Sequence, residues 1–280
     1  MSFGGANYIA ILVAAVAAYL AGAIYYAAIW SSIMIYWFTV GDPVQHHVLY
    51  AYEPLDLASF YAQMTILPAV IIFYVHNETG FYEDYRGFYN AVMARKPLSV
   101  IERQREILTE NLKDALVNLT LIQAVVTFTT VCFAGQIQQF LEMSELERQL
   151  FVNMTLGAFP QAILLFVMVI MFYFQLYPES AVTATVALIG CWAVGGWTLL
   201  AGENTYGLGL LGGTLLGLVV GLYLLFNRVG RLEYLTFSSQ PMAEEKPFRK
   251  DMVAATGGYG IYYIRNGQRQ RVPVPKGDHE

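Results

Sequence analysis

The sequence predicts an all-α, polytopic membrane helical bundle of about six transmembrane helices, with both termini in the cytoplasm. Three observations lead to this fold class: an apolar composition, six long apolar segments, and an uneven distribution of Lys and Arg. Hydrophobic residues make up 56% of the 280 residues and charged residues only 13%, whereas a soluble domain carries about 25% charged residues. Such a chain needs a bilayer to accept its apolar surface.

Six segments have the length and the apolar character of a membrane span, which takes about 20 residues. They are 8–38, 55–75, 112–134, 150–174, 181–200 and 206–226. The second span contains Pro68 and the fourth contains Pro160. Proline is tolerated in a membrane helix where neighbouring groups satisfy the freed carbonyl, so both spans are expected to bend.

The basic residues orient the chain. Segment 76–111 carries five Lys or Arg residues and the chain after 226 carries nine, while the predicted outer loops carry only Arg148. By the positive-inside rule, segment 76–111 and the C-terminal tail lie in the cytoplasm. The loops 39–54, 135–149 and 201–205 then lie outside. Segment 76–111 follows the second span and the tail follows the sixth. Because both numbers are even, six spans place the two segments on the same side of the membrane.

Segment 76–111 is predicted to be a cytoplasmic helical loop. Aromatic residues between 77 and 94 recur at helical spacing. Ser99 and Glu102 predict a capping box that opens a second helix, which continues into the third span. The segment is read equally well as two amphipathic helices on the membrane surface or as a solvated helical hairpin.

The remaining chain divides into two predicted domains. Residues 1–239 form the six-helix bundle, and residues 240–280 form a polar cytoplasmic tail. Two short alternating runs around Asn266-Gly267 predict a small hairpin at 259–274.

Neutral polar side chains inside the spans mark a candidate substrate path, because a polar group in the membrane is costly and indicates function. Aromatic faces and neutral amides suit sugars, which bind by stacking and by hydrogen bonding. The residues selected are Trp30, Tyr61, Gln63, Gln123 and Gln161. The alternative for the aromatic residues is an ordinary interfacial belt.

Two further sets stand out by position. A candidate cytoplasmic gate or partner surface comprises Glu78, Phe81, Tyr85, Arg86 and Tyr89. For Glu78, within His76-Asn77-Glu78, the alternative is an interfacial polar cap. A glycine stripe with four-residue spacing predicts close helix packing. It comprises Gly209, Gly213, Gly217 and Gly221.

Catalytic and metal-binding patterns are missing from the sequence. It has no nucleophile motif, no nucleotide-binding glycine loop and no carboxylate pair within a span, so an enzyme is not expected. His46-His47 lacks the spacing of a metal site, and no metal or cofactor is expected. No basic stripe indicates nucleic acid.

Several motifs occur in an order that resembles one protein family. They are Leu55-Asp56-Leu57, Glu78-Thr79, the aromatic run Phe81, Tyr85, Phe88 and Tyr89, and the closing stretch Arg231-Leu232-Glu233-Tyr234-Leu235-Thr236-Phe237 after Arg228. Ala28-Ile29-Trp30 and Tyr36-Trp37-Phe38 extend the pattern. Over about residues 20–240 the chain resembles the Pel-type, PelG-like exopolysaccharide exporter membrane proteins of the multidrug/oligosaccharide/polysaccharide flippase superfamily.

The resemblance implies a carrier of about twelve helices in two halves, of which this chain matches the C-terminal half. It implies a multi-pass protein of the bacterial inner (cytoplasmic) membrane that takes part in exopolysaccharide export and biofilm formation. The implied partners are membrane lipid, a second transporter half or a homo-oligomer, a cytoplasmic glycosyltransferase, and the polysaccharide substrate. The alternative function is a non-transporting membrane scaffold that anchors the glycosyltransferase.

Overall fold

The computed structural model describes residues 5–44, 49–76, 82–94, 96–231, 262–265 and 268–271. The chain divides into two units, Met1–Glu233 and Tyr234–Glu280. Among the described residues, the first unit has six helical segments that are long and apolar enough to cross a membrane. This confirms the predicted all-α, multi-span fold class, while the side on which each terminus lies stays a prediction.

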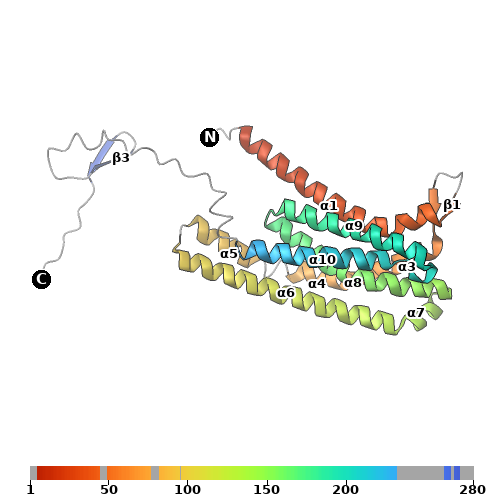
Figure 1. The fold of residues 1–280 in the computed structure, drawn as a ribbon. Helices are drawn as coiled ribbons and strands as arrows, with labels where there is room; N and C mark the ends of the chain where they lie inside the picture. The colour runs from red at the N-terminus through yellow and green to blue at the C-terminus, as the bar shows by residue number, and fades with distance from the viewer. Residues whose placement is uncertain are drawn as a thin grey trace. The chain divides into compact units, whose positions relative to one another are not determined.

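Five spans are single helices. They are α1 (Gly5–Thr39), α6 (Leu98–Cys132), α8 (Glu145–Tyr173), α9 (Tyr177–Ala201) and α10 (Leu208–Val229). The second span consists of two helices in succession, α3 (Glu53–Met64) and α4 (Leu67–His76). Figure 1 shows α6, α8, α9 and α10 running side by side.

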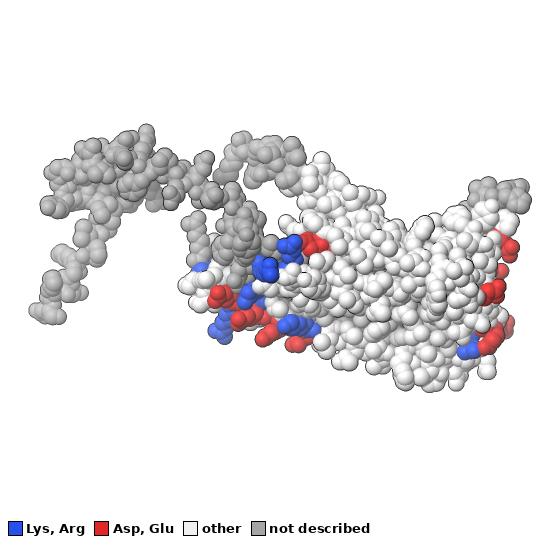
Figure 2. Space-filling view, viewed as in Figure 1, with Lys and Arg blue, Asp and Glu red and all other residues white. Residues whose placement is uncertain are grey.

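Charged residues lie at the ends of the helices. On the face seen in Figure 2, Lys, Arg, Asp and Glu gather at the two ends of the helical unit, and the long band between them is free of charge. Helix α6 has 35 residues, which at a rise of about 1.5 Å each gives about 52 Å. Because the hydrocarbon core is about 30 Å thick, α6 extends well beyond it.

The start of α6 corrects one prediction. The helix runs without interruption from Leu98 into the third span, as expected, but Ser99 does not cap it. Pro97 occupies the N-cap position, and its carbonyl accepts a hydrogen bond from the N–H of Val100 at 2.9 Å. Proline is tolerated at a helix start because the N–H groups there have no partner within the helix. The helix begins at Leu98, so Ser99 falls inside its first turn.

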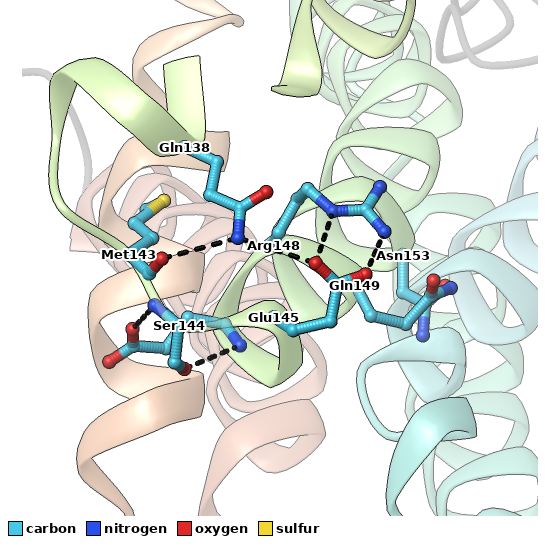
Figure 3. Close-up of polar contacts among 8 residues, drawn as sticks. Gln138, Met143, Ser144, Glu145, Arg148, Gln149 and Asn153 are labelled. Carbon is cyan, nitrogen blue, oxygen red and sulfur yellow. Dashed lines mark hydrogen bonds and ion pairs between the residues drawn. The ribbon is translucent and has the colours of Figure 1, made fainter. Parts of the chain in front are cut away.

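A capping box does form at the start of α8, in a segment predicted only as an outer loop. Ser144 Oγ accepts from the Glu147 N–H at 3.2 Å, and Glu147 Oε2 accepts from the Ser144 N–H at 2.5 Å. Gln138, from the short helix α7 (Ala134–Phe140), donates to the Met143 carbonyl at 3.3 Å (Figure 3). The corner between α7 and α8 is therefore tied by side-chain to backbone bonds, which satisfy exposed ends of both helices.

Short strands occur outside the helices. In the first unit, β1 (Asp42–Val44) pairs antiparallel with β2 (Leu49–Ala51) within the predicted loop 39–54. In the second unit, β3 (Tyr262–Arg265) pairs antiparallel with β4 (Gln268–Arg271), with Arg265 opposite Gln268. The boundary at residue 239 and the placement of the tail stay predictions.

Helix α8 forms the centre of the first unit. In its most apolar stretch 72% of the residues are buried, against 17% to 44% in the other spans. It packs against α3, α6 and α10, and α9 packs against α1 and α10. The fully buried side chains Tyr36, Leu55, Leu150, Met154 and Leu210 form the core where these helices meet.

The α10 glycines lie against neighbouring helices, mainly α9. A Cβ atom on Gly213 would lie 2.2 Å from Cys191 Sγ, and one on Gly217 would lie 2.7 Å from the Ala187 Cβ. Gly209 and Gly221 make similar approaches to Gly195 and Thr183. The two backbones therefore come closer than any larger residue would allow.

An ion pair fastens one end of the same helix pair. Arg228, in the last turn of α10, lies 2.6 Å from the carboxylate of Glu179 in the first turn of α9. Each charge also has the favourable sign for its helix terminus.

We expect Gly213→Ala to destabilise the protein by about 1–3 kcal/mol, because the new methyl group has no space against Cys191. The measurement is the thermal unfolding midpoint of detergent-purified protein. The control is Gly196→Ala in α9, where a Cβ would meet nothing within 4 Å. Equal midpoints for the two variants would contradict the packing role.

Candidate functional site

The second span is interrupted in the membrane at Thr65 and Ile66. Pro68 has no N–H to offer the carbonyl of Met64, and its ring would clash with that carbonyl in a continuous helix. The chain turns instead, and the Ile66 N–H bonds to the Gln63 carbonyl at 3.1 Å. The bend predicted at Pro68 is thus a two-residue break that separates α3 from α4.

A reciprocal amide pair lies next to this break. The Nε2 of Gln63 donates to Oε1 of Gln161 at 3.0 Å, and the Nε2 of Gln161 donates to Oε1 of Gln63 at 3.0 Å. Gln161 directly follows Pro160 in α8. The pair therefore joins the break next to Pro68 to the position after Pro160, around which α8 stays one uninterrupted helix.

Gln123 of α6 reaches the break from a third helix. Its Nε2 donates to the Thr65 carbonyl at 3.3 Å and to Thr127 Oγ1 at 3.4 Å. Because a carbonyl only accepts, the nitrogen of this amide must face Thr65. The Oε1 atom consequently points elsewhere, and it has no donor in the part of the chain that the structure describes.

We call Gln63, Thr65, Gln123, Thr127 and Gln161 the amide cluster. Its three glutamines come from three separate spans, and Gln123 has no exposed surface. The described parts of the spans around it, 57–74, 115–132 and 149–174, contain no Asp, Glu, Lys, Arg or His. The cluster can therefore donate and accept neutral hydrogen bonds or offer oxygens to a ligand, but it has no acid or base for catalysis.

The predicted substrate path is only partly assembled. Gln63, Gln123 and Gln161 lie together in the amide cluster, whereas Trp30 is 53% exposed and packs on Trp37. Tyr61 packs against the apolar core. The path assignment of all five residues stays a prediction.

Sequence analysis missed two members of the cluster's surroundings. Thr127 lies one helical turn after Gln123, and that four-residue spacing was the available signal. The Tyr25 hydroxyl of α1 reaches the Gln161 carbonyl at 3.5 Å. Nothing in the sequence indicated the contact with Tyr25, because it depends on how α1 packs.

The predicted gate or partner surface is described in part. Glu78 and Phe81 lie outside the described residues. Tyr85 and Tyr89 belong to α5 (Tyr82–Met93), and their rings lie 4.6 Å apart. Arg86 of the same helix is exposed.

The tyrosines of α5 connect it to the end of α8. Tyr85 lies 5.8 Å from the Phe174 ring and 6.2 Å from the Tyr173 ring. Burial, with a smaller contribution from Tyr85, raises the pKa of Tyr89 to about 12. These ring contacts make α5 an aromatic cover over this end of α8.

Comparison with known families shows to which family the chain belongs. The PelG family model, whose members are described as candidate exopolysaccharide exporters (EPS-E), matches residues 3–237. The chain belongs to the PelG family. No curated protein and no solved structure matches the chain. The match covers all six spans, the broken helix and the amide cluster.

PelG membership agrees with the membrane fold. Six apolar helices and an exporter family together indicate a multi-pass membrane protein linked to exopolysaccharide export. The PelG family is a transporter-type family and not an enzyme family.

We expect Gln63→Leu and Gln161→Leu each to destabilise the protein by about 1–3 kcal/mol, because the first leaves the buried Gln161 amide unpaired and the second leaves the half-buried Gln63 amide unpaired. The double variant should cost less than the sum of the two single variants, since it removes both partners. Thermal unfolding of the four proteins measures this coupling. Strict additivity would show that the two amides do not depend on each other.

Proposed function

We propose that this chain is an inner-membrane component of exopolysaccharide export and acts as one half of a flippase-type carrier. The observation that carries the proposal is the amide cluster, which places neutral hydrogen-bonding groups at a helix break inside the membrane of a PelG family protein. Sugar hydroxyls are the natural partners of such groups. Broken helices of this kind mark binding sites in secondary transporters.

Differences in packing between the helices suggest which of them move. Helices α9 and α10 are in close contact along the glycine stripe and are fastened by Glu179 and Arg228. Helix α4 instead packs on α6 and meets α8 through an aromatic contact, with the Phe73 and Phe166 rings 4.9 Å apart. The turn at 65–66 is a hinge about which α4 can swing, and such a swing exposes the amide cluster.

The surfaces of the first unit suggest which partners the protein binds. Membrane lipid surrounds the apolar band of Figure 2. A second transporter half, or a second copy of this chain, completes the translocation path opposite the amide cluster. A cytoplasmic glycosyltransferase that makes the polysaccharide docks near α5 and the first turns of α6. The positive-inside rule places this end in the cytoplasm.

A second candidate function is the scaffold that only anchors the glycosyltransferase. The observation in its favour is the extension of α6 beyond the bilayer, where Asn111 of α6 donates to Asp84 of α5 at 2.6 Å. A hairpin fixed in this way offers a rigid docking surface without any need for helix motion.

A cross-link between α4 and α8 tests the carrier. We expect Phe73→Cys/Phe166→Cys, joined by a short bismaleimide, to block polymer secretion, because α4 can no longer swing away from α8. Secreted polymer is measured in polymer-producing cells that lack the chromosomal copy, with Cys132 and Cys191 replaced. The matched control is Ile35→Cys/Gly195→Cys, which joins α1 to α9 where a Gly195 Cβ would lie 3.5 Å from Ile35.

The same cells distinguish the two functions. The carrier predicts that the α4–α8 cross-link stops secretion while the glycosyltransferase stays in the membrane fraction. Unchanged secretion with complete cross-linking would contradict the carrier. Deletion of residues 240–280 adds a second comparison: secretion lost with the glycosyltransferase still at the membrane argues against the scaffold.

A further inference from the structure

Asn118 is a polar side chain on the outer face of α6, within the membrane span. It lies four residues after Asp114, the last charged residue of the helix, which is about 6 Å further along the helix axis. The Asn118 side chain is exposed, and its amide makes no hydrogen bond to any other described residue. Hydrocarbon offers no partner either, so a polar group at this position is costly unless another helix supplies one.

The exposed side chains that follow Asn118 form a single stripe along α6. Leu121, Val125, Phe128 and Cys132 continue from Asn118 at alternating spacings of three and four residues, and all of them are exposed. Two helices that pair in a left-handed supercoil meet through this heptad-type spacing, in water and in membranes. We call these five residues the α6 seam.

An apolar groove with a volume of about 200 Å³ lies beside the α6 seam. Its lining comes from three helices and consists of Leu116, Val117, Thr120 and Leu121 of α6, Ile163 of α8 and Leu222 of α10. Helices in lipid associate through close packing and through hydrogen bonds between polar side chains. The groove can receive a side chain from a neighbouring helix, and Asn118 offers the hydrogen bond.

The chemistry of Asn118 selects a second copy of this chain as the neighbour. A side-chain amide both donates and accepts, so Asn118 is complementary to another Asn118. Two copies insert into the membrane in the same direction, so their α6 helices are parallel when they pair about a two-fold axis. In a parallel pair each heptad position meets its own copy, and a single asparagine in the seam fixes the register.

We propose that the α6 seam is the interface of a dimer, in which the Asn118 amides of two copies bond to each other within the membrane. Asp114 would repel its own copy, so the contact is confined to residues 118–132. Gln123 lies on the buried side of α6, away from the seam. The dimer therefore leaves the amide cluster untouched, and the proposal does not rest on the carrier function.

The test is energy transfer between donor-labelled and acceptor-labelled copies of the full-length protein in liposomes, measured at increasing ratios of lipid to protein. We expect Asn118→Leu to weaken the association by about tenfold, as loss of one interhelical hydrogen bond in a membrane does. Asn118→Gln keeps an amide and should retain the association. The control is Asn90→Leu, the same change at an exposed position of α5, which should associate as the unmodified protein does.

Cysteine cross-linking locates the contact. Cys132 is exposed at the last residue of α6, whereas Cys191 is buried. Oxidation should therefore link two copies through Cys132, and Cys132→Ser should abolish the link. In the Cys132→Ser protein, Val125→Cys should restore it. Ile189→Cys in α9 should not, although the original Val125 and Ile189 side chains are similarly exposed, at 65% and 63%.

The unfolding midpoint separates loss of pairing from loss of the fold. Because Asn118 is exposed within one copy, Asn118→Leu should leave the midpoint of the monomer in detergent unchanged. Four outcomes overturn the proposal: energy transfer no greater than that of a monomeric membrane protein, equal association of Asn118→Leu and the unmodified protein, equal linking at Val125→Cys and Ile189→Cys, or linking of the seam to a different membrane protein in cells.

Discussion

In the hydrocarbon core of a bilayer, a backbone carbonyl released from its helix has no water to bond and must find a donor within the protein. Pro68 has no N–H for the Met64 carbonyl and interrupts the second span, and within that interruption the side-chain amide of Gln123 donates to the Thr65 carbonyl. The broken helix can exist in this position because α6 lies beside it. The arrangement of α3, α4, α6 and α8 depends on this contact, in which a side-chain hydrogen bond from Gln123 takes the place of a hydrogen bond within a continuous helix.

The remainder of the bundle has the opposite character. Along α9 and α10 the backbones approach so closely that added methyl groups would collide, and a glutamate and an arginine join the helix ends. Contact of this kind has a single packed arrangement and resists deformation. A rigid pair beside a hinged span is a physical basis for a carrier in which one part moves against another.

The absence of charge from the described mid-span residues limits the chemistry. Sugar hydroxyls can bond to neutral amides and hydroxyls, whereas acid–base catalysis and carboxylate proton relays cannot be built from these groups. PelG family membership links the chain to exopolysaccharide export, and the amide cluster provides neutral hydrogen-bonding groups within the spans. The α5–α6 hairpin supplies a separate surface, at which the polymer-making enzyme is proposed to dock.

The sequence by itself determined the six spans, since the length of an apolar run is a local property. It also supplied the positions of Pro68 and Pro160 and the glycine stripe of α10. It placed the start of α6 wrongly, because Pro97 and Ser99 are both able to begin a helix and the pattern favoured the serine.

Only the tertiary structure decided which polar side chains meet. Gln63 and Gln161 are 98 positions apart and bond to each other, while Trp30, chosen on the same grounds, packs on Trp37. The physical reason is the rotation of each helix about its own axis. In a span that is apolar on all sides, the local pattern does not fix that rotation, and close contacts such as those of α8 with its neighbours do.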